Sequence, residues 1–228
     1  MIPSHINSIT IGGSLIEPHI QSNQINLSML TKLSITARFD DNYESLNDLT
    51  AAIGNIRCVE LIGFRLLTDI SLLGAGNKHV ILSGCCLLSD FTPLKHVRKV
   101  EMRNCDAFTN ASQLSHVYDL TIDSCPNLVS LKGLSDVHQL TLQCAYKPDC
   151  NLRSLKGCEN IPYIDARHLR FLNPEARSFK YFINNQKVIV PADWVDEEMN
   201  GIERMSEHFL PPFLISDPSR NAYAFVRK

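Results

Sequence analysis

The sequence predicts a repeat solenoid of the α/β type, in which short parallel strands form a curved sheet and 3₁₀ or extended segments form its outer side. Three observations predict it. Apolar residues in the middle of the chain recur with a period of 20 residues, each repeat opens with a two-residue alternation, and apolar residues at every third position follow. Because one such coil cannot bury its own interior, coils must stack and their strands must pair in parallel.

The period is clearest around one unit of the sequence. Its apolar positions are Val100, Met102, Cys105, Phe108, Ala111, Leu114 and Val117. The residues 20 positions before and 20 positions after each of these are also apolar. One further unit begins 21 residues before Val80, at Val59, and follows the same pattern. Four consecutive units therefore share one template, and self-similarity at this length indicates a solenoid.

The chain is expected to have three parts in order. These are an N-terminal cap over residues 1–28, the solenoid over 29–172 and a C-terminal cap over 173–228. Within the solenoid the fifth unit begins in phase at Leu140, carries about four extra residues around positions 146–150 and then resumes, which indicates an outward loop. After Leu172 the period disappears, and terminal units of a solenoid are expected to be atypical.

The C-terminal cap is predicted to be of mixed structure. Residues 182–190 read either as a tight hairpin around Asn184 and Asn185 or as one last solenoid strand at Val188 and Val190. Spacings of three and four then predict an amphipathic helix, ended by Pro211, with the apolar residues Val195, Met199, Ile202, Met205 and Phe209. We expect this segment to cover the last coil, with a docking segment for a second protein as the alternative.

Composition and charge exclude several classes of partner. Lys and Arg number 22 against 24 Asp and Glu, so the formal charge is −2 and no basic excess is available for a nucleic acid. No window reaches the roughly 18 apolar residues of a membrane span, and the N-terminal residues lack the regions of a secretory signal. The sequence therefore predicts a cytoplasmic protein that binds neither nucleic acid nor membrane.

Two consecutive segments carry a resemblance to a known family. Residues 97–105 and 117–125 each place apolar residues at the first, fourth and sixth positions and a cysteine at the ninth. This pattern resembles the leucine-rich repeat consensus L-x-x-L-x-L-x-x-N/C. The resemblance covers roughly residues 25–172 and is to the short type of repeat. It implies a concave strand face that binds another protein.

The cysteines are expected to be free structural thiols. They are Cys58, Cys85, Cys86, Cys105, Cys125, Cys144, Cys150 and Cys158. Cys85, Cys105 and Cys125 share the N/C position of the repeat, where a small side chain is buried as the strand turns. Without a secretory signal, the even count does not argue for disulfides, and no matching C-x-x-C pairs predict zinc. Cys150, in the inserted loop, is the best candidate for a reactive thiol, although an incidental loop cysteine is favoured.

Few features of the sequence point to catalysis or to metal binding. His96, His116 and Asp136 fall in one column of the repeat, where a solvated polar ladder is favoured over a metal site. No nucleophile motif, glycine-rich phosphate loop or H-E-x-x-H motif is present. We therefore expect no enzymatic activity, no cofactor and no metal.

The outward residues of the strands are predicted to bind a protein partner. The predicted partner-binding residues are Glu60, Ile62, His79, Ile81, Ser83, Lys99, Glu101, Arg103, Asp119, Thr121, Asp123 and Gln143. Ile62 and Ile81 are expected to be exposed among charges, as in an interface with a small apolar centre.

The function expected from the sequence is a non-enzymatic protein–protein interaction module, such as an adaptor or recognition subunit. A structural component of a larger assembly is the alternative. A cysteine-dependent transferase or hydrolase is a third and weaker one, because residues 173–228 contain no cysteine.

Overall fold

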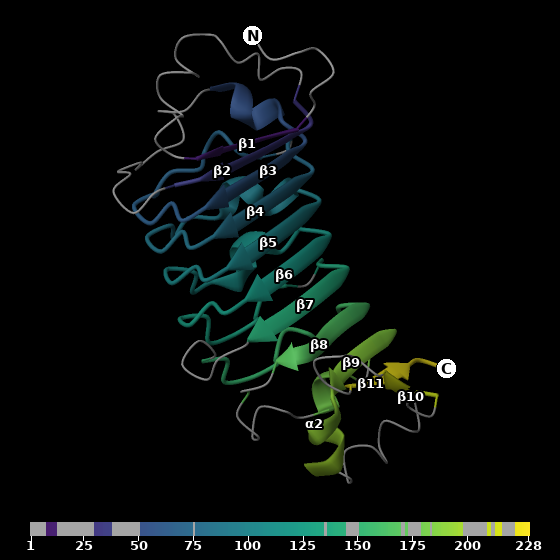
Figure 1. The fold of residues 1–228 in the computed structure, drawn as a ribbon. Coiled ribbons are helices and arrows are strands. Elements are labelled where there is room, and N and C mark those ends of the chain that lie inside the picture. Colours follow the sequence, from purple (N-terminus) through teal and green to yellow (C-terminus); the bar gives the residue numbers. More distant parts are fainter. Residues whose placement is uncertain are drawn as a thin grey trace.

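The protein is a solenoid of stacked parallel strands, as the computed structural model shows (Figure 1). The structure describes residues 8–12, 30–37, 51–74, 76–134, 136–144, 151–169, 172, 179–182, 184–197, 209–210, 213–215 and 222–228. Within these residues the sheet has eleven strands in the order β1-β2-β3-β4-β5-β6-β7-β8-β9-β11-β10. The predicted repeat stack is therefore confirmed.

The strands are short and nearly equal in length. They are β1 Ser8–Gly12, β2 Lys32–Thr36, β3 Cys58–Ile62, β4 His79–Ser83, β5 Lys99–Arg103, β6 Asp119–Asp123, β7 Gln139–Cys144, β8 Tyr163–Leu169, β9 Lys187–Pro191, β10 Phe213–Ile215 and β11 Ala222–Val226. From β1 to β9 each strand pairs in parallel with the next, and β3 to β7 make about five regular turns without a register shift.

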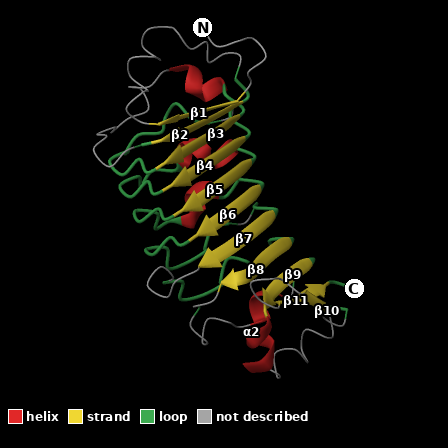
Figure 2. Cartoon of the chain, in the orientation of Figure 1, coloured by secondary structure: helices red, strands yellow, loops and turns green. Residues whose placement is uncertain are grey.

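The side of each coil opposite the strands consists of turns and short 3₁₀ helices (Figure 2). The 3₁₀ segments are η4 Ala51–Asn55, η5 Thr92–His96, η6 Ala111–Leu114 and η9 Phe179–Phe182. Leu94 and Leu114 point inward from η5 and η6, in keeping with the three-residue spacing of this part of the repeat.

The template residues form one continuous apolar core. Val100, Met102, Cys105 and Phe108 of the central unit are each fully buried, and their equivalents one repeat away are buried as well. Phe91 and Phe108 of neighbouring coils meet edge to face, with ring centroids 5.0 Å apart. Each buried large side chain contributes about 1.5 to 3 kcal/mol, so stacking supplies the stability that a single coil lacks.

Each of the strands β3 to β6 is followed directly by a residue in the left-handed region. These residues are Gly63, Gly84, Asn104 and Ser124, with φ values between 51° and 76°. Each donates its backbone N–H to a carbonyl at or next to the end of the next strand, as from Gly84 to the Arg103 carbonyl at 2.8 Å. The left-handed turn redirects the chain, so that the following residue, Cys105 or Cys125 for example, points inward.

One template position holds a polar residue. Asn77 lies where the other units have Val97, Val117 and Val137, and it is fully buried. Its Nδ2 donates hydrogen bonds to the Ile53 carbonyl at 3.1 Å and to the Ile56 carbonyl at 2.7 Å, while its Oδ1 accepts from the Gly74 N–H at 2.9 Å. An apolar template does not predict this residue.

The last solenoid strand is β9, which pairs in parallel with β8 and buries Val188 and Val190. Of the two alternatives for residues 182–190, the structure therefore shows the strand. Beyond it, β11 pairs antiparallel with β9, and β10 pairs antiparallel with β11.

The predicted C-terminal helix is described only over α2, Ala192–Glu197, which packs against β9 and β11. The prediction is wrong at its far end, because Phe209 forms an antiparallel bridge with Arg227 instead of continuing a helix. The Phe209 ring is buried and lies edge to face with Phe225, and this packing holds its backbone beside the last strand. Met199, Ile202 and Met205 lie outside the described residues, as do most of the predicted N-terminal cap and Cys150.

Candidate protein-interaction face

The outward side chains of β3 to β7 form three straight columns. They are Cys58, His79, Lys99, Asp119 and Gln139 in the first column, Glu60, Ile81, Glu101, Thr121 and Thr141 in the second, and Ile62, Ser83, Arg103, Asp123 and Gln143 in the third. The predicted register is thus confirmed, and all the predicted partner-binding residues lie in these columns. We call this surface the strand face.

Glu101 is the centre of an ion-pair cluster on the strand face. Its Oε1 lies 2.9 Å from His79 Nε2 and 3.3 Å from Lys99 Nζ, and its Oε2 lies 2.6 Å from Arg103 Nη2. Burial alone would raise the pKa of the Glu101 carboxyl, but the hydrogen bonds from Arg103 and His79 and the Lys99 charge outweigh it and hold the pKa below its ordinary value. The cluster therefore holds a nearly buried carboxylate in its ionised form.

The cluster extends along the first column. Lys99 Nζ also lies 3.6 Å from Asp119 Oδ2. Desolvation alone would lower the pKa of Lys99, but Asp119 and Glu101 outweigh it and raise this pKa. On the other side of the cluster, Lys32 Nζ of β2 lies 3.8 Å from Glu60 Oε2 of β3. Much of the charge that the sequence assigns to partner binding is therefore paired within the face itself.

The prediction that Ile81 is exposed is wrong. Its exposed fraction is only 9%, and Glu101 beside it is at 8%. Ile81 pairs across the sheet with Glu60 on one side and Glu101 on the other, and these longer side chains flank it. Ile62 is half-buried, so no exposed apolar centre forms on this part of the face.

Cys58, His79 and Glu101 lie in sequence across three strands. Cys58 Sγ is 3.8 Å from His79 Nδ1, and the other ring nitrogen contacts Glu101. A nucleophilic cysteine requires a lowered pKa. Here desolvation raises the pKa of Cys58 and outweighs the Lys32 charge, which lowers it, while the Glu60 and Glu101 carboxylates add smaller contributions to the rise. The environment thus favours the thiol over the thiolate.

The His96, His116 and Asp136 column forms the polar ladder that the sequence favours. The two imidazole rings stack with centroids 6.0 Å apart, and His116 Nδ1 lies 2.8 Å from Asp136 Oδ2. In the part of the chain that the structure describes, no group of three His, Cys, Asp or Glu side chains converges as a metal site would require.

The repeat cysteines are buried and free in the structure. Cys85, Cys105 and Cys125 point into the core, and the Cys105 thiol donates to the backbone carbonyls of Leu82 and Arg103. Burial raises the pKa of Cys85, with smaller contributions in the same direction from Cys105 and Cys86. Cys144, which is one residue out of phase in the sequence, is buried too.

A groove of about 1070 Å³ runs along the first residues of the strands, from β2 to β7. Its charged and aromatic lining includes Lys32, Arg57, Lys78, Arg98, Lys99 and Tyr118. The residues that directly precede each strand are not among the predicted partner-binding residues. The 20-residue period itself identifies them, because Arg98 and Tyr118 occupy the same position in successive repeats.

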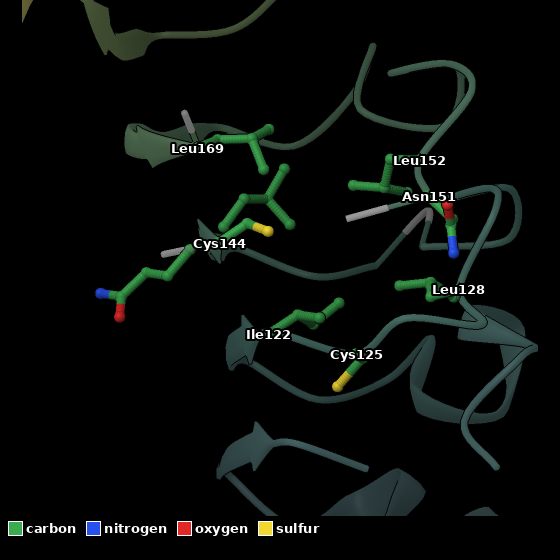
Figure 3. A pocket seen from close by; sticks show the side chains of 9 residues that line it. Ile122, Cys125, Leu128, Cys144, Asn151, Leu152 and Leu169 are labelled. Atoms are coloured by element: carbon green, nitrogen blue, oxygen red, sulfur yellow. The ribbon is translucent and has the colours of Figure 1, made fainter. Parts of the chain in front are cut away.

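A second, very small cavity lies inside the solenoid, between Ile122, Cys125, Leu128, Cys144 and Leu152 (Figure 3). The register between β7 and β8 shifts beside it, between Thr141 and Gln143. Its volume of about 10 Å³ is at the lower limit for one water molecule, so it is a packing defect and not a ligand site.

No protein-family model matches the chain, and comparisons with curated proteins and with solved structures found no significant match. None of the described helices is long and apolar enough to span a membrane. The fold and the site together define a parallel-strand solenoid with a charged strand face and a basic groove beside it.

Proposed function

We propose that the chain is a short leucine-rich repeat protein that acts without catalysis, as an adaptor or recognition subunit, by binding a second protein on the strand face. The observation that carries this proposal is the alignment of the outward side chains in straight columns across β3 to β7. These columns belong to a sheet whose backbone groups are paired on both sides, so binding requires little ordering of the surface.

The ion-pair cluster supports recognition by shape and charge. Glu101 fixes the positions of His79, Lys99 and Arg103, so the charges at the centre of the face are held before a partner arrives. Preset charges of both signs favour a complementary partner and penalise others. The buried free thiols agree with a reducing compartment, and we therefore propose a cytoplasmic location.

The segment after β9 would serve as the cap of the solenoid. Trp194 and Val195 of α2 are buried, and β11 covers the free edge of β9. Covering the last coil is the ordinary role of a terminal unit in a repeat protein.

A capture experiment with matched variants tests the proposed face. The face variant is Thr121→Lys, Thr141→Lys and Gln143→Lys, which adds three positive charges to the second and third columns without replacing a member of the Glu101 cluster. The control variant is Ser89→Lys, Thr109→Lys and Val129→Lys, which adds the same charge at exposed positions of the turns. Both variants are first compared with the native protein by circular dichroism.

We expect the native protein and the control variant to enrich the same partner from a lysate, measured by quantitative mass spectrometry, and the face variant to lose it at least tenfold. Equal capture by all three proteins would show that the strand face is not the binding surface. A partner that copurifies at fixed stoichiometry and never exchanges would favour a structural component of an assembly instead.

A further inference from the structure

The groove at the start of the strands has an excess of positive charge that the described residues do not neutralise. Arg57, Lys78 and Arg98 directly precede β3, β4 and β5, and we call them the basic ladder. All three are exposed, and none forms an ion pair with a described residue. Because neighbouring parallel strands lie about 4.8 Å apart, three like charges are stacked at short range.

The backbone holds the basic ladder in place. The Arg57 carbonyl accepts hydrogen bonds from the N–H groups of Lys78 and His79, and the Lys78 carbonyl accepts one from Lys99 at 3.0 Å. The Arg98 carbonyl accepts one from the next strand in the same way. The ladder is therefore a fixed row of cations along a groove, and only the side chains are free to move.

Among the described residues, Asp119 is the acidic group in the lining of the groove, and it is already engaged, as are Glu60 and Asp136. Asp119 is paired with Lys99, Glu60 with Lys32, and Asp136 with His116. They are not available to neutralise the ladder. Since the whole chain carries a formal charge of only −2, the ladder is a local concentration of positive charge on a nearly neutral protein.

Aromatic rings continue the row beyond Arg98. The Arg98 guanidinium lies over the Tyr118 ring at 5.3 Å, and the Tyr118 and His138 rings stack with centroids 4.6 Å apart. His138 in turn contacts Tyr163, whose ring is 5.1 Å away. Tyr118, which lines the groove, thus has a cation on one side and a ring beside it.

This arrangement discriminates between two kinds of anionic partner. A single-stranded nucleic acid binds by stacking its bases on free aromatic faces, and here the faces of Tyr118 are occupied by Arg98 and His138. Ring edges carry the positive end of the quadrupole and, with tyrosine hydroxyls, suit carboxylates.

We propose that the basic ladder binds an acidic polypeptide segment, in which several Asp or Glu side chains face Arg57, Lys78 and Arg98. The inference rests on the proposed function, because it names the chemistry of the protein partner. The ladder lies beside the strand face, so one partner would contact both surfaces.

Fluorescence anisotropy with a labelled decaglutamate peptide tests the ladder directly, at 50 and 500 mM salt. The ladder variant is Arg57→Glu, Lys78→Glu and Arg98→Glu. The matched control is Lys95→Glu, Lys132→Glu and Lys156→Glu, which makes the same charge change at exposed positions of the turns. A milder variant with glutamine at the three ladder positions removes the cations without adding acids, and serves if the glutamate variant does not fold.

We expect saturable binding to the native protein, affinity lowered at least tenfold in the ladder variant and within twofold of native in the control, and weaker binding at high salt. Absence of saturable binding, or equal loss in both variants, would overturn the inference. So would tighter binding of a ten-nucleotide oligothymidylate, which has nearly the same charge as the peptide.

This assay contains no partner protein, so its failure leaves the proposed function standing. If the peptide binds but the face variant still captures the partner, the proposal that the strand face is the binding surface fails. The proposal that the basic ladder binds an acidic segment then still stands.

Discussion

Asn77 and Asn185 perform the same task in two distant turns of the solenoid. Asn77 Nδ2 donates to the Ile53 and Ile56 carbonyls, and Asn185 Nδ2 donates to the Cys158 and Ile161 carbonyls. Both side chains are fully buried, and both backbone N–H groups also bond three residues back, from Asn77 to Gly74 at 2.9 Å. Each asparagine thus ties the turn of one coil to the start of the strand in the next.

The first prediction concerns this link. Asn77→Val restores the residue type of the other units, yet it should destabilise the protein by about 2 to 4 kcal/mol, because it removes the Asn77 partner of the Ile56 carbonyl and of the Gly74 N–H and one of the two donors to the Ile53 carbonyl. Urea denaturation measures the change, and Lys95→Val, at an exposed position, should stay within about 0.5 kcal/mol of native. Native-like stability of the Asn77 variant would show that the turn rearranges to satisfy these groups.

The second prediction concerns the acid sensitivity of the Glu101 cluster. The pKa of Glu101 is lowered in the folded protein by its cationic partners, although burial opposes this. The stability that its carboxylate contributes is therefore fully present above the unfolded pKa of about 4.3, and it is lost as the pH falls through the lower folded value.

Glu101→Gln should reduce stability at pH 7 by about 1 to 3 kcal/mol, since hydrogen bonds to a charged group are lost. It should also make stability fall less steeply as the pH drops below about 5, measured by urea denaturation at several pH values. Glu60→Gln removes a carboxylate from the same column and serves as the control. Equal flattening in both variants would contradict a special role for Glu101.

The third prediction concerns a turn that requires glycine. Gly157 has a φ of 110°, and a Cβ atom there would overlap the Leu131 carbonyl of the preceding coil. Gly157→Ala should cost at least about 2 kcal/mol through backbone strain and displacement of Leu131. Gly74→Ala is the matched control, because a Cβ there would lie at an ordinary 3.4 Å from the Pro93 carbonyl. Thermal unfolding that ranks the two variants equally would refute this account.

The fourth prediction concerns thiol reactivity. Burial raises the pKa of Cys85 and of Cys158, and both side chains are inaccessible. Iodoacetamide at pH 8 should therefore modify them at least about 100-fold more slowly than the half-buried Cys86, until the protein unfolds. Peptide mapping by mass spectrometry follows each site, and the same reaction in guanidinium chloride is the control. Rapid labelling of Cys158 in the native protein would disprove its burial.

The sequence predicted those parts of the fold that depend on apolar periodicity. The pairing of Val100 with Leu120, and of every outward residue between β3 and β7, follows once the 20-residue period is known. The burial of Ile81 does not follow, since it depends on how neighbouring long side chains lie across it. Asn77 was missed because a template of apolar positions has no place for a polar residue whose hydrogen bonds are made inside the core.

The candidate site was predicted only in part. The columns of the strand face came from the period, but the pairing of Glu101 with His79, Lys99 and Arg103 depends on side-chain geometry that no spacing encodes. The basic ladder was detectable, because Arg57, Lys78 and Arg98 recur at the spacing of the repeat. The predicted site does not include the basic ladder, because charged residues that precede a strand are usually only solvated.

The reversal of strand direction after β9 bears on how long the solenoid can grow. A further coil of the same repeat would have to add a parallel strand, but β11 runs antiparallel to β9 and is followed outward by β10, which has only three residues. Such a short edge gives an incoming strand little to pair with. The change of strand direction therefore limits growth of the sheet at this end, and it opposes end-to-end polymerisation of one molecule on another there.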